Sequence, residues 1–239
     1  WRVVRRIHTS RVLSEQNMKL QYLGDSKDSF KWDYHHHLVE ALGYKTLTIA
    51  WMLTQNDRST HGQTDSTLFP ADAGILNICR QLRETRDLDL ASRLPDVTHG
   101  SYQVRQYGAN RFFSHDDRAD YFGEIPFRSG DQLVFLDPDN GFEPPKHPTA
   151  KHVTFDDIHR ILTRVSGNSI LSVFHHFRHR KFVEDFADIR AKLGPLPSTA
   201  LFWRSLMFVA TSQSAGAIEN AREFNARYAA TRTGVVVIP

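Results

Sequence analysis

Two acidic side chains directly follow a strongly apolar stretch in the middle of the chain. Residues 133–136 are all apolar, and Asp137, Pro138 and Asp139 come next, followed by an Asn-Gly pair. Carboxylates at the end of a buried strand can form the floor of an active site or supply oxygen ligands to Mg²⁺ or Mn²⁺. The same residue types are also common in plain turns, where Asp and Asn cap their own backbone. Their position on the most apolar stretch favours a functional role.

A second group of polar side chains, HHFRHR, follows the mainly apolar residues 169–174. His175 or His176 could act as a general acid or base, because an imidazole ionises near neutral pH. Arg178 could clamp a phosphate through its planar guanidinium group. A solvated basic loop would have the same composition, so both interpretations stay open.

A third set of charges opens a predicted helix, in the stretch GDSKDSFK. The spacing of Asp28, Lys31 and His35 places them on one helical face, opposite an apolar stripe. This face could be solvated, or together with Asp25 it could border a site in which the lysine positions a phosphate or a carboxylate. The three histidines 35–37 point in three directions from a helix and cannot all bind one metal, so we predict structural or surface roles for them.

Secondary structure must position these residues, and the hydrophobic pattern predicts strands that alternate with helices. Such alternation requires crossover connections and a mostly parallel sheet covered on both faces. We therefore predict an α/β fold, a single Rossmann-like three-layer domain with a mostly parallel sheet. The predicted strands are 46–54, 131–137, 169–177, 199–212 and 233–239, with a short extended segment at 20–24, and the predicted helices are 26–43, 71–84, 154–167, 181–194 and 215–230.

The carboxyl ends of parallel strands meet at one edge of a sheet, and open α/β sheets bind their ligands beyond that edge. This rule selects the residues that follow each predicted strand. They are Gly24 and Asp25, the loop that begins at Thr54, residues 137–141 and residues 175–180. We expect these segments to converge on one site.

Composition suggests the domain boundaries. Residues 1–17 carry four arginines and lack the apolar core of a secretory signal, so we interpret them as a basic N-terminal extension, either a leader or a non-native start ahead of Met18. Residues 18–239 form the predicted Rossmann-like domain. Within it, residues 85–130 are rich in Arg, Asp, Gly and Tyr, and we predict an irregular insertion or lid with one or two short strands near residues 102–108.

The chain has 239 residues and a net charge of +3, which permits RNA or DNA as a partner without requiring either. No run of about 18 apolar residues predicts a membrane helix, so no membrane partner is expected. Cys79 is the only cysteine, which excludes an intrachain disulfide and favours a reducing, cytoplasmic location. The absence of a P-loop, GxGxxG, GxSxG, HExxH or CxxC motif argues against the corresponding enzyme classes. The oligomeric state is left open.

Two of these patterns together resemble a known family. Residues 24–31, with Gly-Asp-x-x-Asp-x-x-Lys at the start of a helix, are similar to the G-N-x-x-D-x-x-K opening of the adenine-N6 methyltransferases of large-subunit ribosomal RNA. These enzymes are class I, Rossmann-like and dependent on S-adenosylmethionine. In both, a strand comes next, and LVFLDPDNGF takes the place of a strand that ends in D-P-P-Y. The three-Cys-motif partner proteins have a comparable acid-proline strand end.

The resemblance implies methyl transfer to nucleic acid. Asp137 and Pro138, with Asp139 in place of the second proline, would hold the target amine through a side chain and a backbone carbonyl, while Phe142 or Trp32 would stack on the base. We expect the substrate to contact Asp28, Lys31, Phe142 and Arg178. We expect the cofactor to contact Gly24, Asp25 and Thr54.

The chain departs from the family at the methyl-donor loop. The family's first strand ends in an acidic, Gly-rich turn, whereas here Thr54 begins a loop in which Gly62 is the only glycine. Two other functions therefore stay open. A metal-dependent nuclease or phosphoesterase would hold Mg²⁺ or Mn²⁺ through Asp25, Asp137 and Asp139, with His175 or His176 as general base or acid. A non-catalytic binding protein with a degenerate Rossmann-like fold would use the same acids only to cap turns.

Overall fold

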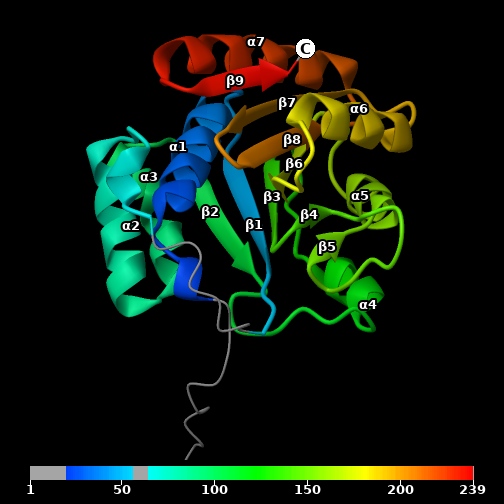
Figure 1. Ribbon diagram of the computed structural model, residues 1–239, viewed down its shortest axis with the longest axis horizontal. Coiled ribbons are helices and arrows are strands. Elements are labelled where there is room, and N and C mark those ends of the chain that lie inside the picture. Colours follow the sequence, from blue (N-terminus) through cyan, green and yellow to red (C-terminus); the bar gives the residue numbers. More distant parts are fainter. Residues whose placement is uncertain (1–19, 56–63, 239) are drawn as a thin grey trace, which may run out of the picture.

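A computed structural model of the protein describes residues 20–55 and 64–238 (Figure 1). The predicted N-terminal extension, residues 1–17, and the loop glycine Gly62 lie outside these described residues. The described segments alternate strands with helices, as the hydrophobic pattern predicts. The strands of the central sheet are β1 (Thr46–Met52), β2 (Gln103–Tyr107), β3 (Leu133–Pro138), β6 (Ile170–His176), β7 (Ser198–Trp203), β8 (Leu206–Thr211) and β9 (Val235–Ile238).

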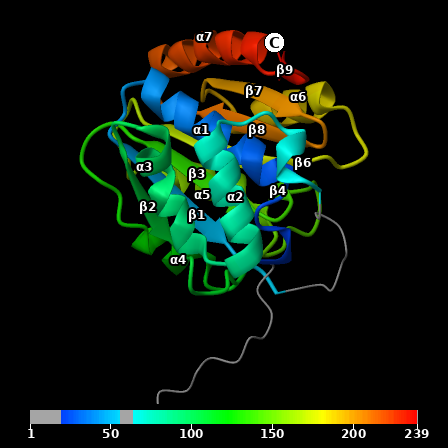
Figure 2. The same cartoon turned by 90° about the vertical axis from the view of Figure 1, so that its left-hand side faces the viewer.

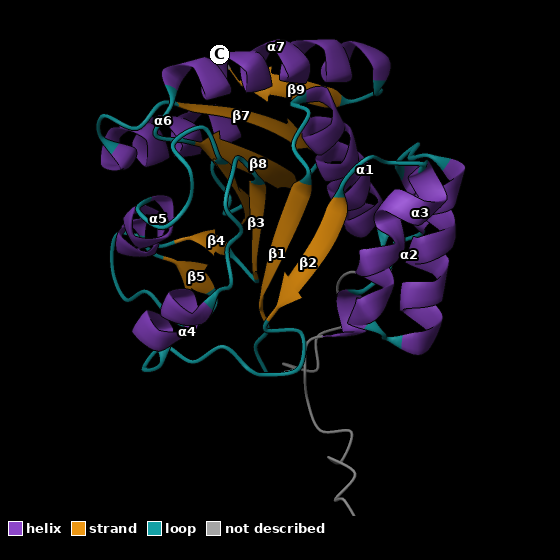
Figure 3. Cartoon of the chain, turned by 180° about the vertical axis from the view of Figure 1, so that it is seen from behind, coloured by secondary structure: helices purple, strands orange, loops and turns teal. Residues whose placement is uncertain are grey.

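The central sheet has seven strands in the order β2-β1-β3-β6-β8-β7-β9. The neighbours β2, β1, β3 and β6 pair in parallel, whereas β8 is antiparallel to both β6 and β7. The last strand, β9, is antiparallel to β7. The arrowheads of β1 and β2 point to the same edge of the sheet (Figure 3), which is the carboxyl edge selected by the sequence. The protein is an α/β, Rossmann-like domain with a mostly parallel sheet, as predicted.

Helices cover both faces of the sheet and make three layers. The helices α1, α2, α3 and α7 lie against one face, where α2 lies in front of α1 in Figure 2, and α4, α5 and α6 lie against the other. A separate two-stranded sheet of β4 (Gly141–Phe142) and β5 (His152–Val153) lies on the α5 side. The helices are α1 (Ser26–Ala41), α2 (Ala73–Thr85), α3 (Leu94–Thr98), α4 (Arg118–Glu124), α5 (Phe155–Leu162), α6 (Phe182–Leu193) and α7 (Ala215–Thr231), with short 3-10 helices at Leu20–Tyr22, Ser66–Leu68 and Leu88–Arg93.

Alternation of side chains along the strands divides the interior into two cores. In β1, Ile49 and Trp51 face the core that contains α1, whereas Ala50 and Met52 face the core that contains α5 and α6. This period of two is the ordinary geometry of a β-strand. Both faces are apolar because both are covered, which explains the continuous apolar runs in the sequence.

Capping residues in the sequence correctly predicted some of the helix ends. Thr154 caps α5, and its side chain and that of Asp157 form reciprocal hydrogen bonds with the backbone of the other residue. This capping box satisfies two donors that the first helical turn would otherwise leave unpaired. Helix α6 ends at the predicted Gly194, which has a φ angle of +64°. These two predicted helix boundaries are confirmed, whereas α5 ends at Leu162 rather than at the predicted Gly167.

Two sequence predictions about secondary structure are wrong. Residues 199–212 form an antiparallel hairpin of β7 and β8 instead of one strand, with Arg204 at the turn in a left-handed conformation (φ 51°). Residues 20–24 begin with a 3-10 turn instead of an extended segment. In the segment 85–130, the predicted strand is present as β2, and it is the edge strand of the central sheet rather than part of a detached lid.

Helix α1 is mostly buried, and exposed residues occur only at its end, at Glu40 and Ala41. Its apolar stripe faces the sheet, and Asp28, Lys31 and His35 are buried as well, because α1 also contacts α2 and α7. A solvated charged face for this helix is therefore wrong. Within the described residues, no helix combines the length and apolar character needed to cross a membrane.

Candidate functional site

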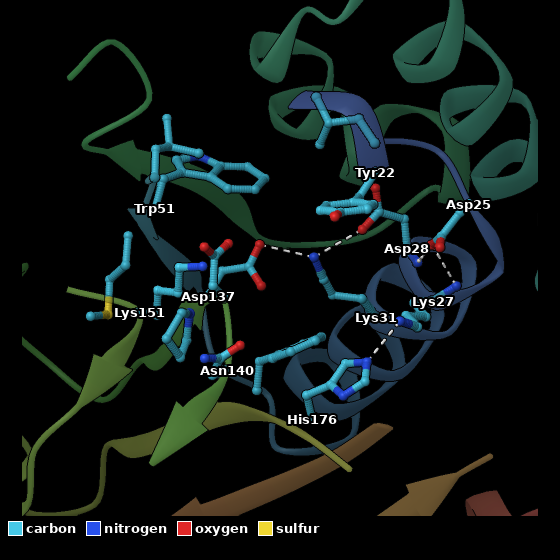
Figure 4. Close-up of a pocket in the computed structure, with 16 residues that line it drawn as sticks. Tyr22, Asp25, Lys27, Asp28, Lys31, Trp51, Asp137, Asn140, Lys151 and His176 are labelled. Atoms are coloured by element: carbon cyan, nitrogen blue, oxygen red, sulfur yellow. Dashed lines mark hydrogen bonds and ion pairs between the residues drawn. The ribbon is translucent and has the colours of Figure 1, made fainter. Parts of the chain in front are cut away.

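A cavity of about 380 Å³ opens where the carboxyl ends of β1, β3 and β6 meet the start of α1 (Figure 4). Its walls combine acids, cations and aromatic rings, with apolar residues from the end of β1. The acids are Asp25, Asp28, Asp137 and Asp139, the nitrogen bases are Lys27, Lys31, Lys151 and His176, and the aromatic rings are Tyr22, Trp51 and Phe174. The carboxyl-edge rule therefore located the cavity from the sequence.

Lys31 joins two of these acids at the cavity wall. Its Nζ lies 2.8 Å from Asp28 Oδ1 and 2.9 Å from Asp137 Oδ2, and the three side chains are almost entirely buried. Burial alone would lower the pKa of Lys31, but the charges of Asp137 and Asp28 outweigh it and raise this pKa. Lys31 is therefore a charged ammonium group, and it fixes the position of the Asp137 carboxylate.

The opening of α1 is organised by its own side chains. The Asp25 carboxylate caps the helix by accepting hydrogen bonds from the backbone N–H groups of Lys27 (2.8 Å) and Asp28 (3.2 Å). The backbone N–H of Gly24 donates to Asp28 Oδ2 at 2.7 Å. Gly24 has a φ angle of +77°, and a Cβ there would overlap the backbone of α2 at Cys79. The pattern Gly-Asp-x-x-Asp-x-x-Lys thus builds a capped helix start that carries the Lys31 ion pair.

Burial sets the charge properties of the acids at the cavity. It raises the pKa of Asp25 to about 6, and the nearby Asp28 adds to this effect. Burial also raises the pKa of Asp137, and the Lys31 charge offsets part of that shift. Lys31 contacts Oδ2 of Asp137, and the other oxygen, Oδ1, has no hydrogen-bond partner among the described residues. This oxygen can accept a hydrogen bond from a ligand.

The turn after β3 is held by hydrogen bonds on both sides. The Thr54 hydroxyl donates to the Asp139 carboxylate, so the end of β1 and the end of β3 are joined. The backbone N–H of Asn140 donates to the carbonyl of Lys151 at 2.9 Å, and the carbonyl of Asn140 accepts from the N–H of His176 at 3.2 Å. Asp139 and Asn140 are thus part of an ordered cavity floor.

His175 lies outside the cavity and supports the same turn from behind. Its Nδ1 accepts a hydrogen bond from the backbone N–H of Phe142 (3.2 Å), and its Nε2 lies 3.4 Å from Asp185. Arg178 donates to the Phe142 carbonyl at 3.0 Å. Burial lowers the pKa of His175, partly offset by Asp185. His175, Arg178 and Phe142 therefore form a buried cluster behind the turn rather than part of the cavity wall.

The structure brings together seven of the predicted site residues at the cavity, among them His176, and two others, Gly24 and Thr54, bind members of that group. The other six are Asp25, Asp28, Lys31, Asp137, Pro138 and Asp139. The two rings expected to stack on a base, Trp32 and Phe142, are fully buried. Trp32 instead packs edge-on against Trp51, with ring centroids 5.7 Å apart.

Sequence reasoning missed several residues of the cavity wall. Trp51 lies at the end of β1, and Lys27 lies in the helix opening, so the carboxyl-edge rule could have included both. Lys151 comes from the loop before β5 and carried no signal. Within the part of the chain that the structure describes, the group of side chains that could hold a metal ion is His36, His37 and Asp72, which lies outside the cavity. There the Arg232 guanidinium already donates to His37 and Asp72.

The fold and site define a Rossmann-like α/β domain with a mixed acidic and basic cavity at its carboxyl edge. No protein-family model matches the chain, and no curated protein matches it in sequence.

Proposed function

We propose that the protein is an S-adenosylmethionine-dependent methyltransferase that acts on an exocyclic amine of a nucleic-acid base. The observation that carries this proposal is the Asp137 carboxylate. It lies at the carboxyl end of β3, Lys31 holds it through Oδ2, and Oδ1 has no hydrogen-bond partner among the described residues. The order of elements also supports it. The capped opening of α1, the strand β1, a strand that ends in Asp-Pro, then α5 and β6 occur in the order that the family resemblance implies.

The cavity residues fit a methyl donor of this kind. A cavity of about 380 Å³ is within the usual size range of small-molecule sites. When bound, S-adenosylmethionine supplies a methyl group on a positively charged sulfur. Tyr22 provides an aromatic surface that favours such a positive charge. The acids Asp28 and Asp139 add negative charge to the same cavity.

The proposed role of Asp137 is to orient the target amine. Oδ1 accepts a hydrogen bond from the amine N–H, which directs the nitrogen lone pair toward the methyl group. A reaction of this type depends mainly on positioning, so a rigid acceptor is more useful than a strong base. The nitrogen loses one proton when it gains the methyl group, and Asp137 Oδ1 is the atom placed to accept it. The raised pKa of Asp137 favours that acceptance.

The aromatic side chains of the cavity wall support a nucleic-acid base as the proposed substrate. Enzymes that methylate bases take the base out of the helical stack and enclose it between aromatic or apolar side chains. Tyr22 and Phe174 supply such surfaces around the acids. The net charge of +3 also favours a polyanionic partner. The single cysteine, Cys79, is buried, and a cytoplasmic location accords with this proposal.

The metal-dependent hydrolase is not favoured by the geometry. Its metal ligands would be Asp25, Asp137 and Asp139, but Asp25 caps α1 and Asp139 accepts a hydrogen bond from Thr54. Asp137 is already paired with the Lys31 ammonium group. We therefore do not propose that function.

Calorimetric titration with S-adenosylmethionine and S-adenosylhomocysteine tests the proposal, followed by transfer of a labelled methyl group to RNA and DNA. Asp137→Asn should reduce methyl transfer by about a hundredfold or more while donor binding persists, because a positioned acceptor contributes on that scale. Asp116→Asn, at an exposed loop position, serves as the matched control and should retain activity. Absence of donor binding by the wild-type protein would overturn the proposal and leave the non-catalytic binding role.

A further inference from the structure

Lys27 and His176 form a pair at the wall of the cavity. Lys27 Nζ lies 3.0 Å from His176 Nε2, although the two residues come from α1 and β6. Both line the cavity (Figure 4). Neither residue belongs to the pattern on which the family resemblance rests.

The surroundings of His176 fix which partner donates. His176 Nδ1 lies 3.1 Å from the backbone carbonyl of Phe177, and a carbonyl can only accept, so Nδ1 carries the proton. The ring is neutral, because burial and the charge of Lys27 lower the pKa of His176. Nε2 is then an acceptor, and the Lys27 ammonium donates one of its three N–H groups to it.

The charge of Lys27 lacks a direct counter-charge in the described part of the chain, where no carboxylate oxygen lies within ion-pair distance of its Nζ. This contrasts with Lys31, which has two such partners. The nearby Asp25 carboxylate is used to cap α1. A half-buried ammonium that faces a cavity with only a neutral imidazole as its partner is stabilised when an anion binds there.

We propose that Lys27, held by His176, binds an anionic group of the ligand, either a carboxylate or a phosphate. The cavity then has two ends of opposite character. The Asp137 end accepts N–H groups and positive charge, and the Lys27 end takes negative charge. The inference rests on the proposed function only for the source of the anion, which is either the carboxylate of the methyl donor or a phosphate of the nucleic acid.

Two titrations of the full chain separate these sources. The first compares S-adenosylmethionine with decarboxylated S-adenosylmethionine, which lacks only the carboxylate. The second uses inorganic phosphate alone. Each is performed on the wild-type protein, on Lys27→Met and Lys27→Arg, and on Lys45→Met, which makes the same change at an exposed position before the amino end of β1. Thermal unfolding of each variant verifies that it is folded.

If the anion is the donor carboxylate, the wild-type protein binds S-adenosylmethionine at least about tenfold more tightly than the decarboxylated form, because a charge-assisted hydrogen bond contributes on this scale. Lys27→Met abolishes that preference, whereas Lys27→Arg and Lys45→Met retain it. If the anion is a phosphate, the two donors bind alike and phosphate binding is lost only in Lys27→Met.

An unchanged donor preference and an unchanged phosphate affinity in folded Lys27→Met would overturn the inference. So would a wild-type protein that shows neither the preference nor phosphate binding. A wild-type protein that binds neither form of the donor but binds phosphate through Lys27 would overturn the proposed function and support the anion site.

Discussion

Lys31 Nζ lies 2.9 Å from Asp137 Oδ2, although 106 positions separate the two residues in the sequence. The contact joins the first turn and a half of α1 to the carboxyl end of β3, across a boundary between two layers of the domain. Both side chains are almost fully buried, so the ion pair is shielded from solvent and its geometry is fixed. The opening of α1 and the acid-proline turn are therefore one structural unit.

Lys31→Met should strongly destabilise the protein. The change keeps most of the apolar stem but leaves the Asp28 and Asp137 carboxylates buried without their shared ammonium group. Removing one partner of a buried ion pair costs about 3–5 kcal/mol. Urea-induced unfolding measures this loss of unfolding free energy. Lys45→Met, at an exposed position, should change stability by less than about 0.5 kcal/mol, and an equally small effect of Lys31→Met would show that the ion pair is not buried in solution.

Much of the fold could be predicted from the sequence because each strand is a continuous apolar run and each helix has a periodic stripe. The hairpin of β7 and β8 was missed because its turn at Arg204 and Ser205 contains no Gly, Asn, Asp or Pro, and a single Ser is a weak turn signal. The burial of the polar residues of α1 was also not predicted. Its polar residues are satisfied by partners from distant segments, and the local pattern contains no information about those partners.

The sequence predicted which strand ends form the candidate site, but not which of their side chains face the cavity. Adjacent residues of a strand point to opposite faces, and only one of the pair His175 and His176 could face the cavity. The sequence did not determine which. The structure places His176 at the cavity and His175 against Asp185 on the opposite side. The same limit applies to the ion pair of Lys31 and Asp137, which depends on how α1 sits on the sheet.

Gly141→Ala should destabilise the turn after β3. Gly141 has a φ angle of +101°, and a Cβ there would lie 2.6 Å from His175 Cα and overlap the imidazole ring. We expect a loss of about 2 kcal/mol or more, because a strained backbone and a steric overlap act together. Thermal and urea unfolding measure it. Gly123→Ala, in α4 with no atom within 4 Å of the added Cβ, should be neutral or stabilising, and a similar loss in both variants would contradict the assigned cause.

Trp51 should report ligand binding through its fluorescence. Trp51 lines the cavity from a buried position, and its indole N–H donates to Gln106 at 2.6 Å. A ligand in the cavity therefore changes the polarity around a ring that is held in place. Trp51→Phe should remove most of the fluorescence change on addition of S-adenosylmethionine, because the indole ring lies directly beneath the cavity wall. Trp203→Phe, which alters a tryptophan outside the cavity, should retain the signal. Loss of the signal in Trp203→Phe instead would place the ligand elsewhere.

Asp25 should make stability depend on pH in an unusual direction for an acid. Burial raises the pKa of its carboxyl group from 3.8 to about 6 in the folded protein, so the folded state binds the proton more tightly than the unfolded state. The contribution of this group to the unfolding free energy therefore falls as pH rises from about 4 to about 6. Asp25→Asn keeps an acceptor for the cap of α1 but does not titrate.

The difference in unfolding free energy between Asp25→Asn and the wild-type protein should therefore shift in favour of the variant by on the order of 2 kcal/mol between pH 4 and pH 7, following a pKa difference of about two. Urea unfolding at several pH values measures this difference. Asp116→Asn, an exposed change of the same kind, should show a nearly constant difference across the range. A difference that moves in favour of the wild-type protein with rising pH would mean that the folded chain stabilises the ionised carboxylate, as it would if the Lys27 ammonium paired with Asp25 rather than with a ligand anion.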